Sequence, residues 1–295
     1  MSWLLNFFSD RTHQTKINSS LSEPQNLLGV IQGSGIGPIM SVMFINDLVD
    51  ALNQFGVCVK LFADDVKVYI RVLNNCDVQQ LQRALDALAN WEDVWQLSRP
   101  ISVSKCSVVN IGKSSVPLSS LHIRNNVLNI TKIGIDLGIT VIDDLKPRAH
   151  INSAVTKAHQ RANAILLCFL SRNIDMLKSA FIVYVRPFLE YNSVVWSPYY
   201  KQDIEAIERV QRRFSKRSRG LKEFTYEERL KFLGWPTLEF RRLNNDLLWS
   251  YKILFGLVHL NSDHFFKLSP NQTRGHGFKL YKQFSSSNAD NVGKK

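Results

Sequence analysis

Two adjacent carboxylates lie in the segment Cys58-Val59-Lys60-Leu61-Phe62-Ala63-Asp64-Asp65-Val66-Lys67-Val68-Tyr69, between two short runs of β-type residues. Such runs around a turn predict a hairpin, which would hold both acids at its tip through backbone hydrogen bonds. Mg²⁺ prefers oxygen ligands and is usually held by one or two carboxylates plus substrate phosphates. The segment therefore indicates a magnesium site, and a solvated turn is the alternative, since Asp is common in turns.

Paired acids on a rigid hairpin also indicate a reaction class. Two Mg²⁺ ions about 4 Å apart can stabilise both the attacking and the leaving oxygen of a phosphoryl transfer. The hairpin therefore favours nucleotidyl transfer.

A glycine-rich segment precedes the hairpin: Gly29-Val30-Ile31-Gln32-Gly33-Ser34-Gly35-Ile36-Gly37-Pro38. Glycine lets the backbone approach a flat or phosphorylated ligand closely, and Pro38 suits the first turn of a following helix. The apolar run that follows predicts a helix that ends near residues 45–48. The spacing is neither the dinucleotide fingerprint nor the Walker A pattern.

The order Gln-Gly-Ser-x-x-Gly-Pro, helix, Leu-Phe-Ala-Asp-Asp resembles the palm of a reverse transcriptase from a non-LTR (LINE-type, jockey-like) retrotransposon. The resemblance implies RNA-directed DNA polymerisation, with Mg²⁺ as cofactor and an RNA template, a DNA primer or duplex and a dNTP as ligands. It implies that Asp64 and Asp65 are catalytic and bind metal. It also implies that Gln32, Gly33 and Phe62 contact the nucleotide.

A second catalytic candidate follows from the same resemblance. The segment Ser104-Lys105-Cys106-Ser107-Val108-Val109 is similar to the family's Lys-Cys/Ser strand, whose lysine lies near the leaving pyrophosphate. Lys105 is therefore the candidate proton donor. An exposed lysine at a strand edge is the competing interpretation, because Lys commonly blocks edge strands.

The remaining pattern predicts helices and short strands. Apolar residues recur at helical steps from Val78 to Trp95 and again from Ile151 to Phe169. Between these helices, residues 122–128 predict a hairpin with Asn125-Asn126 at its turn, and residues 135–143 predict a strand.

A basic run without acids extends from Arg209 to Lys222. This much charge of one sign on a helix favours a polyanionic partner, and a solvated basic face or a nuclear-targeting cluster are the alternatives. The resemblance implies a helical thumb that grips duplex through phosphate contacts. The candidate nucleic-acid-binding residues are Arg209, Arg212, Arg213, Lys216, Arg217, Arg219 and Lys222.

Composition agrees with this interpretation. The 295 residues are 45% hydrophobic and carry a formal net charge of +12, which points to nucleic acid or an anionic membrane surface. No apolar stretch is long enough to span a membrane. The four cysteines lack zinc-site spacing, and residues 1–8 do not resemble a signal peptide. We expect an intracellular protein of the nucleus or cytoplasm that is not secreted.

We expect an α+β fold. A partial right-hand polymerase palm, an antiparallel sheet with packed helices, should span residues 1–113, and a connecting β region near the primer grip residues 114–145. An all-helical thumb and C-terminal domain should span residues 146–268, followed by a loosely ordered tail over 269–295.

The sequence departs from the family at its front, where the fingers and the palm strand that carries another metal-binding aspartate are expected but not found. We therefore expect an N-terminally truncated fragment. Loss of one preorganised electrostatic group costs an enzyme about a hundred- to a thousandfold, so activity of the chain alone should be absent or very weak. The alternative is a non-catalytic remnant that binds nucleic acid without sequence preference.

Overall fold

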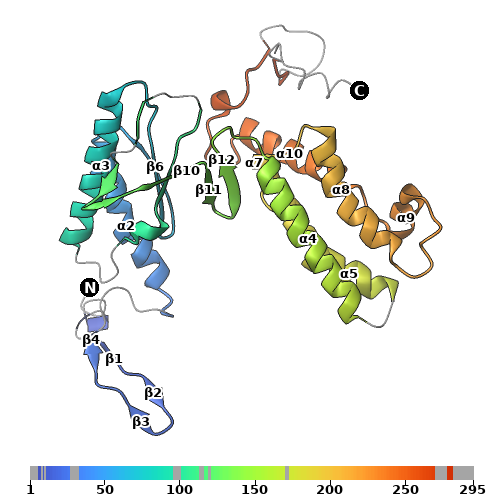
Figure 1. The fold of residues 1–295 in the computed structure, drawn as a ribbon, viewed down its shortest axis with the longest axis horizontal. Coiled ribbons are helices and arrows are strands. Elements are labelled where there is room, and N and C mark those ends of the chain that lie inside the picture. The colour runs from blue at the N-terminus through green and yellow to red at the C-terminus, as the bar shows by residue number, and fades with distance from the viewer. Residues whose placement is uncertain are drawn as a thin grey trace. The chain divides into compact units, whose positions relative to one another are not determined.

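Buried hydrophobic side chains form two separate cores, one in each of two units of the chain, Met1–Gly134 and Ile135–Lys295 (Figure 1). The computed structural model describes residues 6–7, 9, 11–26, 33–95, 101–112, 116–118, 121–169, 173–269 and 278–281. In this described part, helices alternate with small sheets in the first unit and dominate the second.

The first unit is built around one antiparallel hairpin. Strand β5 (Cys58–Phe62) pairs with β6 (Asp65–Tyr69), with Val59 opposite Val68 and Leu61 opposite Val66. These four residues belong to the same core as side chains of α2 (Gly37–Asn53) and α3 (Asn75–Val94). The alternation of apolar and polar residues along these strands therefore gives the hairpin one packed face and one exposed face.

Helix boundaries follow local chemistry. Pro38 lies in the first turn of α2, as expected. The prediction that this helix ends near residues 45–48 was wrong, because α2 continues to Asn53 and buries Leu48 and Leu52 completely. Helix α3 starts at a capping box in which Asn74 and Asp77 satisfy each other's backbone N–H groups.

The other strands of the first unit are short. Antiparallel pairs join β1 (Thr12–His13) with β4 (Gln25–Asn26), β2 (Lys16–Ile17) with β3 (Ser20–Leu21), and β8 (His122–Ile123) with β9 (Asn126–Val127). Strand β7 (Ser107–Val109), which follows the 3-10 turn η1 (Val103–Lys105), pairs in parallel with β10 (Asn129–Thr131). Among described residues the strands thus form two-stranded sheets, where one larger antiparallel palm sheet was expected.

Two turns differ from their predicted positions. The hairpin at 122–128 turns at Arg124 and Asn125, one residue earlier than expected, with Arg124 at φ +53°. The prediction of a single strand over residues 135–143 was wrong. The structure has two strands there, β11 (Ile133–Asp136) and β12 (Ile139–Ile142). Leu137 and Gly138 both have positive φ, +46° and +82°, which is the requirement of a two-residue hairpin turn.

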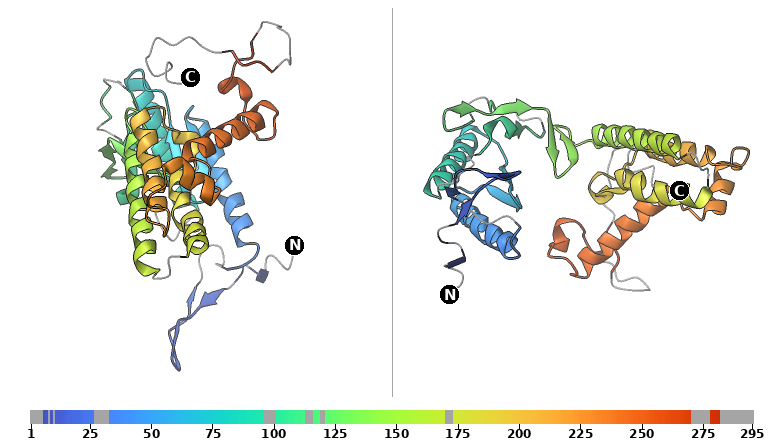
Figure 2. Two further views of the ribbon diagram at one scale, coloured as in Figure 1. Left: turned by 90° about the vertical axis from the view of Figure 1, so that its right-hand side faces the viewer. Right: turned by 90° about the horizontal axis from the view of Figure 1, so that it is seen from below.

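The second unit is mainly helical. Its elements are α4 (Arg148–Cys168), α5 (Ile174–Tyr184), α6 (Arg186–Glu190), α7 (Ser193–Trp196), α8 (Lys201–Lys216), α9 (Tyr226–Leu233), α10 (Leu238–Leu254) and the 3-10 turn η2 (Ser262–His264). Helix α4 packs against α5, α6 and α8, which lie beside it (Figure 2).

Aromatic rings fill the centre of the second core. The ring centroid of Phe181 lies 4.8 Å from those of both Phe214 and Trp235. Trp235 is buried. These rings join α5, α8 and the segment that precedes α10.

Candidate functional site

The two acids lie at the tip of the β5–β6 hairpin, as the sequence predicted. Phe62 pairs with Asp65, so Ala63 and Asp64 form a two-residue loop and Asp65 is the first residue of β6. Both carboxylates are exposed. Ala63 has φ +51°, a left-handed conformation that a residue with a Cβ adopts at a cost of about 1–2 kcal/mol. Strand pairing fixes the backbone that carries the acids, and the surrounding pairing and packing must offset the strain at Ala63 beside them.

The exposed face of the hairpin carries aromatic and basic groups next to the acids. Lys60 is opposite Lys67, and Phe62 is opposite Asp65. Phe62 and Tyr69 are 63% and 47% exposed. Two lysines directly opposite each other repel, so this face suits an anionic partner that lies across the strands.

The hairpin offers two carboxylates to a metal ion. The part of the chain that the structure describes contains no group of three or more His, Cys, Asp or Glu side chains arranged to hold a metal. Asp64 and Asp65 nevertheless fit Mg²⁺, because this ion uses few protein ligands and completes its coordination with water and substrate phosphates.

The glycine-rich loop is described only from Gly33 onward, and Gln32 lies outside the described residues. Gly33 has φ +83°, and among the described residues other than its chain neighbours no heavy atom lies within 4 Å of the position that a Cβ would take. The Ser34 hydroxyl accepts a hydrogen bond of 3.0 Å from the backbone N–H of Gly37 at the start of α2. Open space beside Gly33 is what close approach of a flat ligand requires.

Lys105 is exposed at the end of η1, immediately before β7. Within the described residues, no hydrogen bond or ion pair joins it to Asp64 or Asp65. Its role as a proton donor stays a prediction.

The predicted basic residues occupy α8 and the loop after it. Four of them, Arg209, Arg213, Lys216 and Arg217, are exposed along one side of the helix, and Arg219 and Lys222 are exposed in the loop. Arg212 differs, because it forms an ion pair with Glu205 and its guanidinium lies 4.8 Å from the ring centroid of Tyr226. Arg212 therefore also holds α8 to α9.

A groove between α4 and α8 adds residues that the sequence did not indicate. It has a volume of ≈ 550 Å³, and Arg213, Lys216 and Arg217 line its α8 side. His159 and Asn163, one turn apart, line its α4 side, and Asn163 accepts a 2.7 Å hydrogen bond from Arg217. The groove presents cationic and polar donors together, which is the chemistry of phosphate recognition.

His159 is the one titratable group that lines this groove from α4. Burial lowers its pKa below the usual range, and the nearby Arg213 and Arg209 lower it further. The imidazole is therefore held neutral at neutral pH by desolvation and by cationic neighbours. The sequence shows only that His159 and Asn163 are four residues apart, which places them on one face of a helix. That face becomes part of a site only because α8 packs beside it.

The model of the family described as Reverse transcriptase (RNA-dependent DNA polymerase) matches residues 2–235. The chain belongs to the reverse transcriptase family. An uncharacterised protein of Caenorhabditis elegans is 27% identical over 127 residues, which are 42% of this chain and 64% of that protein. The chain thus spans less than two thirds of that relative's length, and no solved structure matches it.

The matched residues of this reverse transcriptase family member include the acid-bearing hairpin and the α4–α8 groove. Helix α10 begins at Leu238, after the match ends. Among its described residues, no helix is long and apolar enough to cross a membrane.

The strained turn generates a prediction about the acid-bearing hairpin. Replacing Ala63 by Val should destabilise the hairpin by about 1–3 kcal/mol, because a β-branched residue at φ +51° is strongly disfavoured. Ala63→Gly should be neutral or slightly stabilising, because glycine adopts this conformation freely. Amide hydrogen exchange at Lys60 and Lys67 measures the opening of the hairpin, because hydrogen-bonded pairs alternate along it from Phe62 and Asp65, which flank the loop. Equal protection in the Val and Gly variants would mean that the turn does not depend on the left-handed conformation.

Proposed function

We propose that this chain is a polymerase module of a non-LTR (LINE-type, jockey-like) reverse transcriptase, with a palm in the first unit and a thumb in the second. The observation that carries the proposal is the pair of carboxylates fixed at a hairpin tip within the residues that match the family. The proposed divisions are residues 1–113 for the palm, 114–145 for the connecting region and 146–268 for the thumb and C-terminal domain.

The proposed reaction joins a deoxynucleotide to a primer. The primer 3′-hydroxyl attacks the α-phosphate, a new oxygen–phosphorus bond forms, and the bond to pyrophosphate breaks. Asp64 would be the principal ligand of Mg²⁺ and Asp65 its companion. Bound Mg²⁺ would neutralise charge on the reacting phosphates. Gln32, Gly33 and Phe62 would position the nucleotide, and Lys105 would give a proton to the leaving pyrophosphate.

We propose that the chain by itself catalyses this reaction very weakly or not at all. Two divalent cations about 4 Å apart repel each other strongly unless carboxylates lie between them. The described residues supply two acids at the hairpin and no cluster of three potential ligands. A missing electrostatic group of this kind costs about a hundred- to a thousandfold in rate.

A second candidate function is nucleic-acid binding without catalysis. The α4–α8 groove and the formal net charge of +12 favour it. Contacts to phosphates carry no sequence information, so such binding would be sequence-independent and would weaken steeply as salt rises. Because nucleic acid is the proposed partner, we expect the chain to act in the nucleus or cytoplasm.

Primer extension on an RNA template tests the catalytic proposal. The parent chain should extend a DNA primer at most about a hundredth as fast as a complete reverse transcriptase. Any extension should disappear when Asp64 and Asp65 are both replaced by Asn, while duplex binding remains in both proteins. Extension that survives the double replacement would show that these acids are not the catalytic ones. Fast extension by the parent would show that the chain supplies all the carboxylates that catalysis needs.

Binding of an RNA–DNA duplex as a function of salt tests the basic groove. The double variant Arg213→Gln, Lys216→Gln should lower the slope of log K against log[salt] by about 2, because each phosphate contact contributes about 0.9. Lys201→Gln, Lys231→Gln is the control, since it removes the same charge from exposed positions outside the groove lining. Equal slopes in the two double variants would mean that net charge alone governs affinity.

The pH dependence of duplex binding tests the part played by His159. Phosphate in the groove would favour the imidazolium, so the pKa of His159 should rise on binding and the complex should take up a proton. Affinity should then increase as the pH falls from about 7.5 to about 5.5 and level off below the lowered pKa of the free protein.

His159→Gln should flatten this pH dependence, whereas His259→Gln, at an exposed position outside the groove lining, should leave it unchanged. A pH dependence that is the same in both variants would mean that His159 does not face the bound phosphates.

A further inference from the structure

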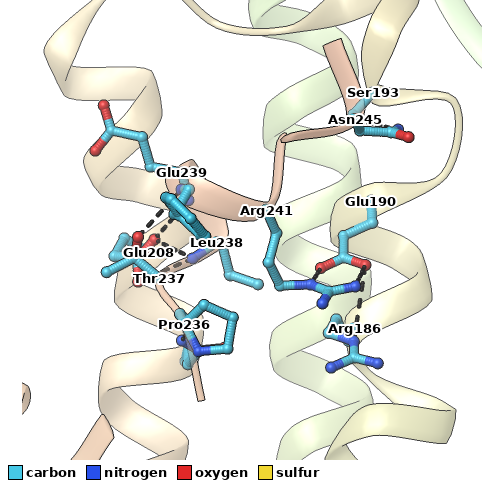
Figure 3. Close-up of polar contacts among 12 residues, drawn as sticks. Arg186, Glu190, Ser193, Glu208, Pro236, Thr237, Leu238, Glu239, Arg241 and Asn245 are labelled. Carbon is cyan, nitrogen blue, oxygen red and sulfur yellow. Dashed lines mark hydrogen bonds and ion pairs between the residues drawn. The ribbon is translucent and has the colours of Figure 1, made fainter. Parts of the chain in front are cut away.

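A second cavity lies in the helical unit, apart from the α4–α8 groove. It has a volume of ≈ 360 Å³ and is formed by residues of α6, α7 and α10, together with Pro236. Its polar lining consists of Glu190, Ser193, Arg241, Arg242, Asn244 and Asn245. Figure 3 shows Arg241 beside Glu190, and Asn245 beside Ser193. Helix α10 lies beyond the residues that match the family, whereas Glu190 and Ser193 lie within them.

Arg242 is the unusual group in the lining. Only 3% of this residue is exposed, and neither terminal nitrogen of its guanidinium has a hydrogen-bond partner among the described residues. Burial lowers the pKa of Arg242, although arginine stays protonated in proteins. A buried charge without a partner is costly, and native proteins normally pair or hydrogen-bond such groups.

Two of the carboxylates around Arg242 are engaged elsewhere. Glu190 accepts hydrogen bonds from Arg241, one of them 2.9 Å long, and its Oε2 lies 3.7 Å from Nε of Arg186. Glu208 accepts from the backbone N–H groups of Leu238 and Glu239 at 3.0 and 3.3 Å (Figure 3). These acids, together with Glu239 and Asp246, attract Arg242 through space, but among the described residues none of them accepts a hydrogen bond from its terminal nitrogens.

Asp246, one turn further along α10, is another carboxylate near Arg242. Its Oδ2 accepts a 3.1 Å hydrogen bond from the Ser197 hydroxyl, and its buried Oδ1 has no partner among the described residues. Burial raises the pKa of this carboxyl, which indicates poor solvation of its charged form. Asp246 therefore does not neutralise Arg242 by a direct contact.

The side chains that line the cavity carry a net positive charge. They include two guanidiniums, those of Arg241 and Arg242, and one carboxylate, that of Glu190, which already forms ion pairs with Arg241 and Arg186. The side-chain amides of Asn244 and Asn245 add neutral donors to the lining. Several fixed donors that converge on one space match the acceptor oxygens of a phosphate, which arginine binds in a planar, two-pronged geometry.

We propose that this cavity binds a phosphate group that accepts hydrogen bonds from Arg242 and from the polar residues at its rim. The two terminal nitrogens are covered in the free protein, so the rim side chains must turn aside when the anion enters. The phosphate belongs either to a nucleic-acid backbone or to a small phosphorylated molecule. The site does not depend on the polymerase activity or on the basic face of α8.

Isothermal titration of the full chain with inorganic phosphate at constant ionic strength tests the proposal. The parent should show saturable binding of one phosphate. Arg242→Met should weaken this binding about ten- to a hundredfold, which is the range for loss of hydrogen bonds to a charged group. The variant should remain folded, because it replaces an unpaired buried charge by an apolar side chain of similar length.

Two further variants separate loss of the site from loss of the fold. Asn245→Asp keeps Arg242 but places a negative charge in the lining, so it should also weaken phosphate binding. Arg83→Met removes an exposed arginine outside the lining, one to which no binding role is assigned, and should leave binding unchanged. No saturable binding by the parent, or equal affinity in the parent and in folded Arg242→Met, would overturn the proposal.

A single-stranded oligonucleotide identifies the source of the phosphate. If its affinity falls in Arg242→Met together with that for inorganic phosphate, the site binds a nucleic-acid backbone. If only the affinity for inorganic phosphate falls, the natural ligand is a small phosphorylated molecule. The variant Arg213→Gln, Lys216→Gln should keep the inorganic phosphate site intact, so failure of the proposed groove and failure of this cavity give different results.

Discussion

The register of the β5–β6 hairpin is the constraint on which the first unit depends. A two-residue loop at Ala63 and Asp64 sets Val59 opposite Val68 and Leu61 opposite Val66, and this pairing directs four apolar side chains to the core. A slip of one residue would send those side chains to solvent, because side chains alternate strictly along a strand. The same register keeps the two acids at the tip outside the core. Core packing therefore holds the candidate metal ligands in place, even though neither acid takes part in it.

A buried carboxylate has a comparable role in the second unit. Glu208 is 6% exposed on α8, and it accepts hydrogen bonds from the first backbone N–H groups of α10 and from the Tyr226 hydroxyl of α9. Burial and the adjacent Glu208 raise the pKa of Tyr226, so the phenol stays protonated and donates. Negative charge at a helix N-terminus is stabilising. Because this inner face fixes α8 against α9 and α10, the opposite face is free to carry exposed arginines and lysines.

The sequence predicted those features that depend on local pattern. The paired acids between alternating strands, the helical periodicity of α3 and α4, and the basic run along α8 are all properties of consecutive residues. The turn at Leu137 and Gly138 was missed because the flanking isoleucines extend the strand pattern across it. The roles of His159 and Arg242 could not be found in this way. Each follows from helices distant in sequence that bury the side chain and decide which partners it has.

The candidate catalytic acids and the proposed phosphate-binding residues belong to parts of the chain with separate hydrophobic cores. The acids belong to a hairpin held by one core, and the basic groove and the Arg242 cavity belong to helices held by another. The proposed phosphate binding by the helical unit would need only that arginine and lysine stay charged. It would tolerate variation in geometry, because each phosphate contact adds a similar electrostatic contribution to the binding free energy. Catalysis at two metal ions tolerates much less, since charge and position must both be correct within a small space. A member of this family that lost one of its metal-binding carboxylates would therefore lose most of its polymerisation rate and little of its affinity for nucleic acid.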